Sequence, residues 1–291
     1  MQNYYDMIKI TIGMTAYNSE KYIEASIKSL LAQSVKEFKL IISDDASSDS
    51  TEMVCRKLMS LDSRIYYIRQ EKNLGPKANF ESVFRLCETE YFMWASHDDI
   101  WSRTFIEKCI SELDANPDAG FVITKWIVES RKIPFLRRAF LPNMAFVADP
   151  DSITRMMSYT SLPFLSFKDN MTYGIWRQQA LSRIISDTRK LKYFSIGGAA
   201  NEYTLLLYRG CYAPNAYLRK RYIYAPPGSF IAPFIDFLYT LIWWKDEGHK
   251  KVPTYFDQDY LDDLETVFNI AGLDNQTIAH AIKLNMLHMK L

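Results

Sequence analysis

The stretch FKLIISDDASSDST, residues 38–51, decides the fold class of this 291-residue chain. Its first six residues form a short apolar run of the kind found in buried parallel strands. The run stops at Asp44 and Asp45, and Ser50 or Thr51 then offers an N-cap for a following helix. The stretch therefore predicts a buried strand, an acidic turn and a helix.

The same alternation of strand and helix patterns continues on both sides of this stretch. Ser19 is predicted to be the N-cap of the first helix. Short loops between the elements favour right-handed βαβ units, and thus an α/β fold with a mostly parallel sheet. Strands are expected at 8–14, 38–43, 65–68, 91–95 and 120–126, and helices at about 19–31, 51–59, 80–86 and 103–115.

Polar residues follow three of the predicted strands. The loop Thr15-Ala16-Tyr17-Asn18 follows the first strand, Asp44-Asp45 the second, and Asp98-Asp99 the strand at 91–95. Ligands of parallel sheets bind beyond the carboxyl ends of the strands, so these loops should converge on one edge. Adjacent carboxylates repel each other unless a cation or hydrogen-bond donors offset their charge, so each pair indicates either a metal site or a capped turn. Oxygen ligands favour Mg²⁺ or Mn²⁺, with diphosphate oxygens completing the shell.

Composition narrows the class of protein. Hydrophobic residues make up 48% of the chain and charged residues 24%, which is typical of a globular protein. The formal net charge of +1 gives no overall field that attracts nucleic acid. Four widely spaced cysteines indicate a reducing compartment. The N-terminal sequence lacks the pattern of a secretory signal, so we expect a cytoplasmic location.

The second half of the chain shows weaker periodicity. Residues 127–172 are interpreted as excursions over the sheet that form part of an acceptor site, and residues after about 226 as a helical appendage. The apolar stretch 229–245 ends in two tryptophans and a lysine, and it is short for a membrane span. It predicts a buried helix, a contact in a homo-oligomer, or peripheral contact with a membrane surface.

Five motifs in order resemble the start of glycosyltransferase family 2. They are ITIGMTAYN at 10–18, SLLAQS at 29–34, ISDDASSDST at 42–51, NLG at 73–75 with Asn79-Phe80, and EYF at 90–92 with HDDIW at 97–101. The resemblance implies a GT-A fold, with a catalytic domain at 1–225 and a C-terminal helical extension at 226–291. Within that domain, residues 1–126 would bind the nucleotide sugar and residues 127–225 would bind the acceptor.

The resemblance also implies roles on the nucleotide side of the site. Asp44 would contact the nucleobase, beside the backbone of Thr15 and Ala16 and the ring of Tyr17. Lys77 would either meet the diphosphate or remain a solvated loop lysine.

The metal motif of the family corresponds to HDD at 97–99, in which His97 holds the variable position and is not expected to be a ligand. Asp99 would bind a divalent metal, Mn²⁺ or Mg²⁺. Asp98 would lie near the same metal or near the ribose.

An inverting transfer needs a general base, which the family places at the start of a later helix. Glu202 is the candidate, in the segment NEYTLLLYRG at 201–210. The family usually has Asp there, and an ungapped match places Ala199 at the base position instead. Asp169 and Asp187 are the other acids to consider.

The resemblance implies an inverting transferase that moves a sugar from a nucleoside diphosphate sugar to a glycan or lipid-linked glycan, such as a bacterial capsule or lipopolysaccharide. A nucleotidyltransferase is an alternative, but no Gly-rich basic loop follows the first strand. A phospho-receiver module is disfavoured by the second acidic pair. A catalytically inactive member that binds nucleotide or pairs with an active subunit stays open, because of the spacing at Glu202.

Overall fold

The computed structural model describes residues 8–129, 137–140, 144–161, 168–191, 199–220 and 258–289. Its first half alternates strands and helices as predicted. The elements are β1 (Ile10–Ala16), α1 (Ile23–Leu31), β2 (Phe38–Asp44), α2 (Thr51–Leu61), β3 (Ile65–Arg69), α3 (Pro76–Phe84) and β4 (Tyr91–Ser96). Strands β3, β2, β1 and β4 lie side by side in that order, and each neighbouring pair is parallel.

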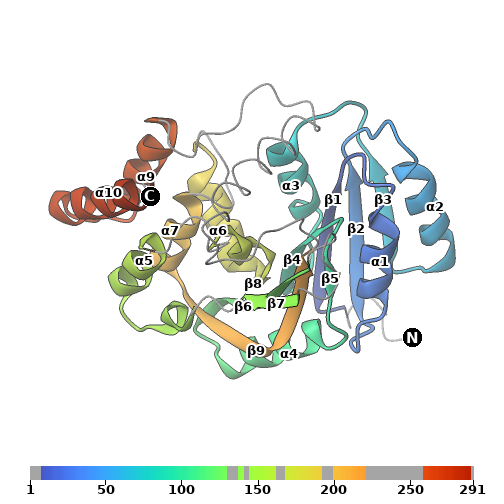
Figure 1. Cartoon of the computed structure of the whole chain (residues 1–291), viewed down its shortest axis with the longest axis horizontal. Helices are drawn as coiled ribbons and strands as arrows, with labels where there is room; N and C mark the ends of the chain where they lie inside the picture. Colours follow the sequence, from blue (N-terminus) through green and yellow to red (C-terminus); the bar gives the residue numbers. More distant parts are fainter. Residues whose placement is uncertain are drawn as a thin grey trace.

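Helices cover both faces of this parallel half. Helices α1 and α2 lie on one side of β1, β2 and β3, and α3 lies on the other (Figure 1). A Cβ atom at Gly13 in β1 would lie 2.7 Å from the ring of Phe92 and 2.8 Å from Val83 of α3. The missing side chain therefore lets α3 pack closely against β1.

The start of the first helix differs from the sequence-based expectation. Helix α1 begins at Ile23, with Tyr22 in the N-cap position, so the N-cap role predicted for Ser19 is wrong. The hydroxyl of Ser19 donates to the carbonyl of Tyr17, 3.1 Å away, and accepts from the Tyr17 amide at 3.2 Å. The serine thus stabilises the loop after β1 instead of capping the helix.

The second half extends the sheet with mixed strand directions. Its elements are β5 (Ile100–Trp101), α4 (Phe105–Ala115), β6 (Ala119–Glu129), β7 (Arg137–Phe140), η2 (Ala145–Ala148), α5 (Ser152–Thr160), η4 (Lys168–Tyr173), β8 (Ile175–Arg177), α6 (Gln178–Thr188), α7 (Ala199–Leu207) and β9 (Arg209–Lys220). Strand β8 pairs antiparallel with β4 and β6, and β9 pairs parallel with β6. The full order is β3-β2-β1-β4-β8-β6-β9-β5, with β7 paired to β6.

Two further helices, α9 (Gln258–Ile270) and α10 (Asn275–Met289), follow near the C-terminus. Helix α9 packs against α7, and α10 packs against α9 and α5. The proposed domain boundary at 225 and the apolar stretch 229–245 lie outside the described residues. No helix in the part that the structure describes has the length and apolar character needed to cross a bilayer.

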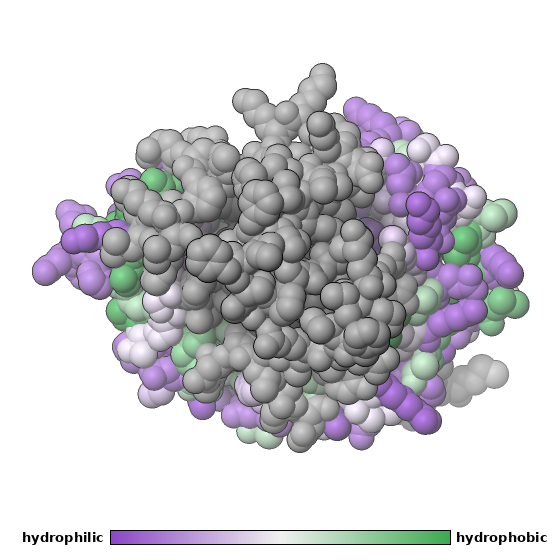
Figure 2. Space-filling view, in the orientation of Figure 1, coloured by the Kyte–Doolittle hydropathy of each residue, from purple (hydrophilic) through white to green (hydrophobic). Residues whose placement is uncertain are grey.

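The described surface and cysteines agree with a globular fold. The outer surface around α2 is mostly hydrophilic (Figure 2), and a few large apolar side chains, among them Met53 and Leu61, are exposed on the described surface. Single exposed apolar residues are normal on soluble domains. All four cysteines are buried and free, so the core contains no disulfide.

Candidate active site

Strands β2, β1 and β4 end at the same level of the sheet. Thr15 in β1 lies opposite Ser43 in β2 and opposite Ser96 in β4. The three loops that follow these strands therefore begin side by side, as their sequence positions predicted. This edge is where parallel sheets bind ligands.

The loops after β1 and β2 are joined by hydrogen bonds between side chains and backbone. Asn18 accepts from the Ser48 amide at 2.8 Å, and its own amide donates to the Ser47 hydroxyl at 2.9 Å. Asn18 and Ala46 both have positive φ, 48° and 59°, which is uncommon for residues with a Cβ. The hydrogen bonds of Asn18 therefore hold the two loops together, and each loop contains one residue in the left-handed region.

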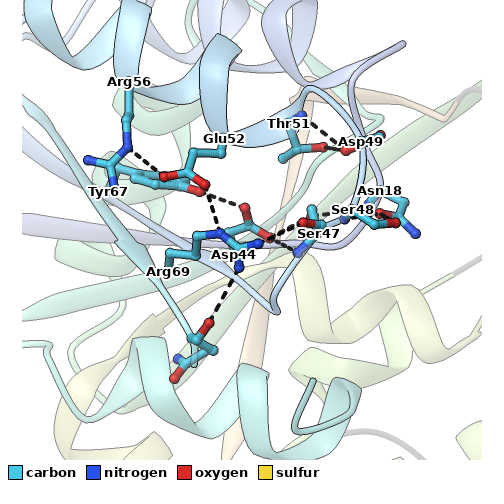
Figure 3. Close-up of polar contacts among 11 residues, drawn as sticks. Asn18, Asp44, Ser47, Ser48, Asp49, Thr51, Glu52, Arg56, Tyr67 and Arg69 are labelled. Atoms are coloured by element: carbon cyan, nitrogen blue, oxygen red, sulfur yellow. Dashed lines mark hydrogen bonds and ion pairs between the residues drawn. The ribbon is translucent and has the colours of Figure 1, made fainter. Parts of the chain in front are cut away.

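Asp44 is fully buried and forms the centre of a polar cluster at the end of β2 (Figure 3). Its Oδ1 accepts from the Ser47 amide at 2.8 Å and from the Ser47 hydroxyl at 2.5 Å. Its Oδ2 accepts from the phenol of Tyr67 at 2.6 Å. Burial and this bond raise the pKa of Tyr67 well above its ordinary value. Asp44 thus organises the loop after β2, and its contact with a nucleobase stays a prediction.

Arg69 of β3 supports the same loop from outside (Figure 3). It donates to the Ser47 carbonyl at 2.9 Å and to Glu52 at 2.8 Å, and Glu52 also binds Arg56 at 2.7 Å. Hydrogen bonds from Arg56 and Arg69 hold the pKa of Glu52 below its usual range. The Ser47 turn is therefore held from both sides, by Asp44 and by Arg69.

Asp45 points to the opposite side of β2 and fixes the loop before α3. Its carboxylate accepts from the amides of Leu74 at 2.7 Å and Gly75 at 3.0 Å. Lys77 lies in the first turn of α3, and its ammonium donates to the Leu191 carbonyl at 2.8 Å, just beyond α6. The lysine is thus tied to the segment that leads towards α7, and its contact with a diphosphate stays a prediction.

The other predicted nucleotide-side residues lie in the loop after β1. The Ala16 carbonyl accepts from the Asp45 amide at 2.8 Å, which holds the first two loops in register. Tyr17 is half-buried beside them. The Thr15 carbonyl lies 3.2 Å from Nδ1 of His97. His97 therefore connects the loop after β4 to the loop after β1.

The acidic pair after β4 completes this edge of the sheet. Asp98 is half-buried and accepts a hydrogen bond from the Ser96 hydroxyl, whereas Asp99 is only 1% exposed. In the described residues, no group of three or more His, Cys, Asp or Glu side chains could hold a metal. Two carboxylates fit a hard divalent ion whose remaining ligands are phosphate oxygens and water.

Glu202 lies at the interface between α7 and α9. It is fully buried, and Oε1 accepts from the phenol of Tyr260 in α9 at 3.4 Å. Among the alternatives, Asp187 accepts from Tyr203 at 2.7 Å and lies 3.6 Å from Arg183. The side chain of Asp169, in η4, lies outside the described residues. The structure groups the residues of the loops after β1, β2 and β4, which were predicted to bind nucleotide and metal, at one edge of the sheet, and it places Glu202 on a separate helix.

Sequence reasoning missed Tyr67 and Tyr260. Tyr67 donates a hydrogen bond to Asp44 on the neighbouring strand, and Tyr260 donates one to Glu202 across a helix interface. Both contacts depend on the tertiary structure. No spacing along the chain marks either residue.

The fold is that of the GT-A glycosyltransferases. A crystal structure of S. aureus TarS in complex with UDP-GlcNAc superposes with a TM-score of 0.57 at 17% identity, and the match covers 97% of this chain and 81% of that one. The mannosyltransferase PcManGT from Pyrobaculum calidifontis, in complex with GDP-Man and Mn²⁺, matches with a TM-score of 0.53 at 15% identity, over 96% of this chain and 80% of that one. At these identities the likeness shows the fold alone.

The sequence identifies the family. The profile of Glycosyl transferase family 2 matches residues 11–187, so the chain belongs to that family. An uncharacterized glycosyltransferase of Haemophilus influenzae is 31% identical over 107 residues, which are 37% of this chain and 33% of that protein. The Campylobacter jejuni GalNAc(5)-diNAcBac-PP-undecaprenol beta-1,3-glucosyltransferase is 32% identical over 94 residues, 32% of this chain and 30% of that protein. The match thus spans about a third of the length of these relatives.

Proposed function

We propose that this chain is an inverting glycosyltransferase. It moves a sugar from a nucleoside diphosphate sugar to a hydroxyl of a glycan or lipid-linked glycan, in the synthesis of a bacterial surface polysaccharide. The observation that carries the proposal is the acidic pair Asp98-Asp99 at the end of β4, beside the loops after β1 and β2. The lipid-linked acceptor named for the Campylobacter relative supports the acceptor class.

On the donor side, Asp98 and Asp99 would hold Mn²⁺ or Mg²⁺ together with the diphosphate. The ion supplies Lewis-acid chemistry that neutralises the departing nucleoside diphosphate. Asp44 would accept a hydrogen bond from the nucleobase, next to the loop of Thr15, Ala16 and Tyr17.

Lys77 would turn from the Leu191 carbonyl to the diphosphate when donor binds. Both partners of the lysine are oxygen acceptors, so the exchange keeps its charge hydrogen-bonded.

On the acceptor side, Glu202 would take the proton from the acceptor hydroxyl. The acceptor oxygen forms its bond to the anomeric carbon while the bond from that carbon to the diphosphate oxygen breaks. The bonding electron pair leaves with the diphosphate, and the configuration inverts. Asp187 and Asp169 are the next acids to consider for this role.

The proposal is tested by donor binding. Thermal unfolding is measured with UDP-, GDP- and dTDP-sugars, each with Mn²⁺ and with EDTA. A ligand that binds only the folded chain raises the melting temperature, by an amount set by its concentration relative to Kd. At least one sugar nucleotide should do so in a Mn²⁺-dependent manner. If none does, the chain does not bind nucleotide sugars in the proposed way.

One observation favours a second candidate, a family member without catalytic activity that binds nucleotide or pairs with an active subunit. Glu202 is fully buried against α9, which is an unusual setting for a base that must meet an acceptor. Hydrolysis of a bound sugar nucleotide, measured without acceptor, separates the two candidates. A catalytic chain releases sugar slowly, and an inactive one releases none.

The setting in the cell is also part of the proposal. Four free, buried thiols suit a reducing cytoplasm, where the chain would work as a soluble or peripheral protein. Contact with the inner membrane through 229–245, or a homo-oligomer formed there, concerns residues outside the described part. Sedimentation with and without liposomes of anionic lipid tests both.

A further inference from the structure

Three polar side chains on one side of α1 meet the loop that carries the acidic pair. Ser26 and Ser29 are one helical turn apart, and Gln33 follows just after the helix ends. Residues three and four apart share a helix face, so these side chains line up along α1. Ser26 and Gln33 are fully buried and Ser29 is half-buried.

Ser26 and Ser29 bind the loop on both sides of the acidic pair. The Ser26 hydroxyl donates to the carbonyl of Ser96 at 2.9 Å, two residues before Asp98. The amide of Trp101 donates to the Ser29 hydroxyl at 3.2 Å, two residues after Asp99. The two aspartates therefore sit in a short arc whose two ends are fixed to the same helix.

Gln33 extends this attachment to the start of α4. Its Nε2 donates to the Ser102 carbonyl at 2.8 Å, and its Oε1 accepts from the Ile106 amide at 3.1 Å. Nε2 also donates to the Ser29 carbonyl at 3.2 Å, which ties the glutamine to α1 itself. The side-chain amide of Gln33 thus forms hydrogen bonds with three backbone groups. Leaving such buried groups without a hydrogen bond would lower the stability of the fold.

We infer that Ser26, Ser29 and Gln33 are positioning residues for the acidic pair, and that α1 determines where the metal binds. The inference rests on the metal role given to Asp98 and Asp99 in the proposed function. Two adjacent carboxylates repel each other, so an untethered loop would separate them. Holding the backbone at both ends would fix the arc that carries the pair before donor arrives, and such preorganisation strengthens binding.

The test uses the whole chain and two substitutions. Ser29→Ala removes the acceptor for the Trp101 amide while placing the best helix former in α1, so the fold is retained. Gln33→Met keeps the length of the side chain and removes its hydrogen bonds. Amide hydrogen exchange should become faster at Trp101 in the first variant and at Ile106 in the second, and should stay unchanged in β1.

The functional readout is the gain in UDP affinity on adding Mn²⁺, measured by calorimetry against an EDTA sample. We expect each variant to bind UDP in EDTA within twofold of wild type. The factor by which Mn²⁺ increases UDP affinity should be about tenfold smaller in each variant than in wild type, a difference of about 1.4 kcal/mol. Ser29→Thr, which keeps the hydroxyl, should restore the gain. Thr188→Val in α6 removes a buried hydroxyl that donates to the Ile184 carbonyl, and it should leave the gain unchanged.

The outcomes separate the inference from the proposed function. A wild-type chain with no Mn²⁺-dependent gain overturns the metal role and the positioning role together. A wild-type gain that Ser29→Ala and Gln33→Met both retain, despite faster exchange at Trp101 or Ile106, overturns the positioning role alone. If Gln33→Met does not fold, Ser29→Ala decides the question with its Ser29→Thr partner.

Discussion

Tyr67 donates a hydrogen bond to Asp44 across two neighbouring parallel strands, with 2.6 Å between the phenol oxygen and Oδ2. Together with the two bonds from Ser47, this gives the carboxylate three donors from the protein itself. An ionised carboxylate offers about four acceptor sites. Asp44 therefore has capacity for about one more donor, such as a single nucleobase N–H.

Asp44→Asn should weaken binding of a nucleoside diphosphate both with Mn²⁺ and in EDTA, because an amide oxygen is a weaker acceptor than a carboxylate. It should also lower the free energy of unfolding by about 1–3 kcal/mol, since a buried network loses its charged centre. Calorimetry and urea unfolding measure the two effects. Tyr67→Phe is the matched control, expected to lower stability by about 1 kcal/mol while nucleotide still binds. Unchanged affinity of Asp44→Asn in EDTA removes Asp44 from the nucleotide site.

Asp99→Ala should abolish the Mn²⁺-dependent part of nucleotide binding and leave the fold intact. A metal ligand is lost, so the effect should exceed that of one hydrogen bond. Titration of UDP at fixed Mn²⁺ measures it, with circular dichroism as the check on folding. Asp118→Ala removes a 61% exposed carboxylate that pairs with Arg209, and it should bind UDP and Mn²⁺ normally. If Asp99→Ala binds both as tightly as wild type, the metal assignment is wrong.

Glu202→Gln should leave donor affinity nearly unchanged and lower transfer by a factor of about 10² to 10⁴, because a general base acts on the acceptor. Turnover and kcat/KM should fall together. Glu265→Gln, an exposed change on α9, provides the control and should transfer at the wild-type rate. Transfer within threefold of wild type in Glu202→Gln ends the base assignment, and Asp187 and Asp169 are then changed in turn.

Ala46→Gly should raise the free energy of unfolding by up to about 1 kcal/mol, because alanine at a φ of 59° carries the cost of the left-handed region. Part of that gain is offset by the greater freedom of glycine in the unfolded chain. Ala25→Gly inside α1 is the control and should cost about 1 kcal/mol instead. Urea unfolding compares the two. Equal destabilisation by both changes would show that the turn at Ala46 is unstrained.

The parallel half was predictable because its signals are local. Apolar runs that stop at Asp44 and at Ser96 mark strand ends, and parallel strands bring those ends to one edge. The second half was predicted less fully. Strand β8 pairs antiparallel with β4, and β9 pairs parallel with β6 and antiparallel with β5. These partners lie far along the chain, and no periodicity of the sequence predicts such pairing.

Within the candidate site, residue types were predictable and contacts were not. The sequence places Asp44 at the end of β2, but its bond to Tyr67 depends on the β2–β3 register, in which Tyr67 lies opposite Ile42. Glu202 was predicted to lie on a helix, and it does. Its contact with Tyr260 joins residues 58 apart in sequence and depends on how α9 packs.

Strand β9 has a consequence for engineering. It begins directly after α7, which carries Glu202, and it ends beside β5, where the backbone of Arg219 pairs with that of Ile100, the residue after the acidic pair. The residues proposed for acceptor and donor chemistry are therefore joined by one continuous strand. A chimera that exchanges residues after 126 for those of a relative would cut β6 near its end, and it would pair a foreign β9 with the original β5 and most of the original β6. We therefore expect a chimera to acquire the substrate specificity of the relative only if β5, β6 and β9 all come from that relative.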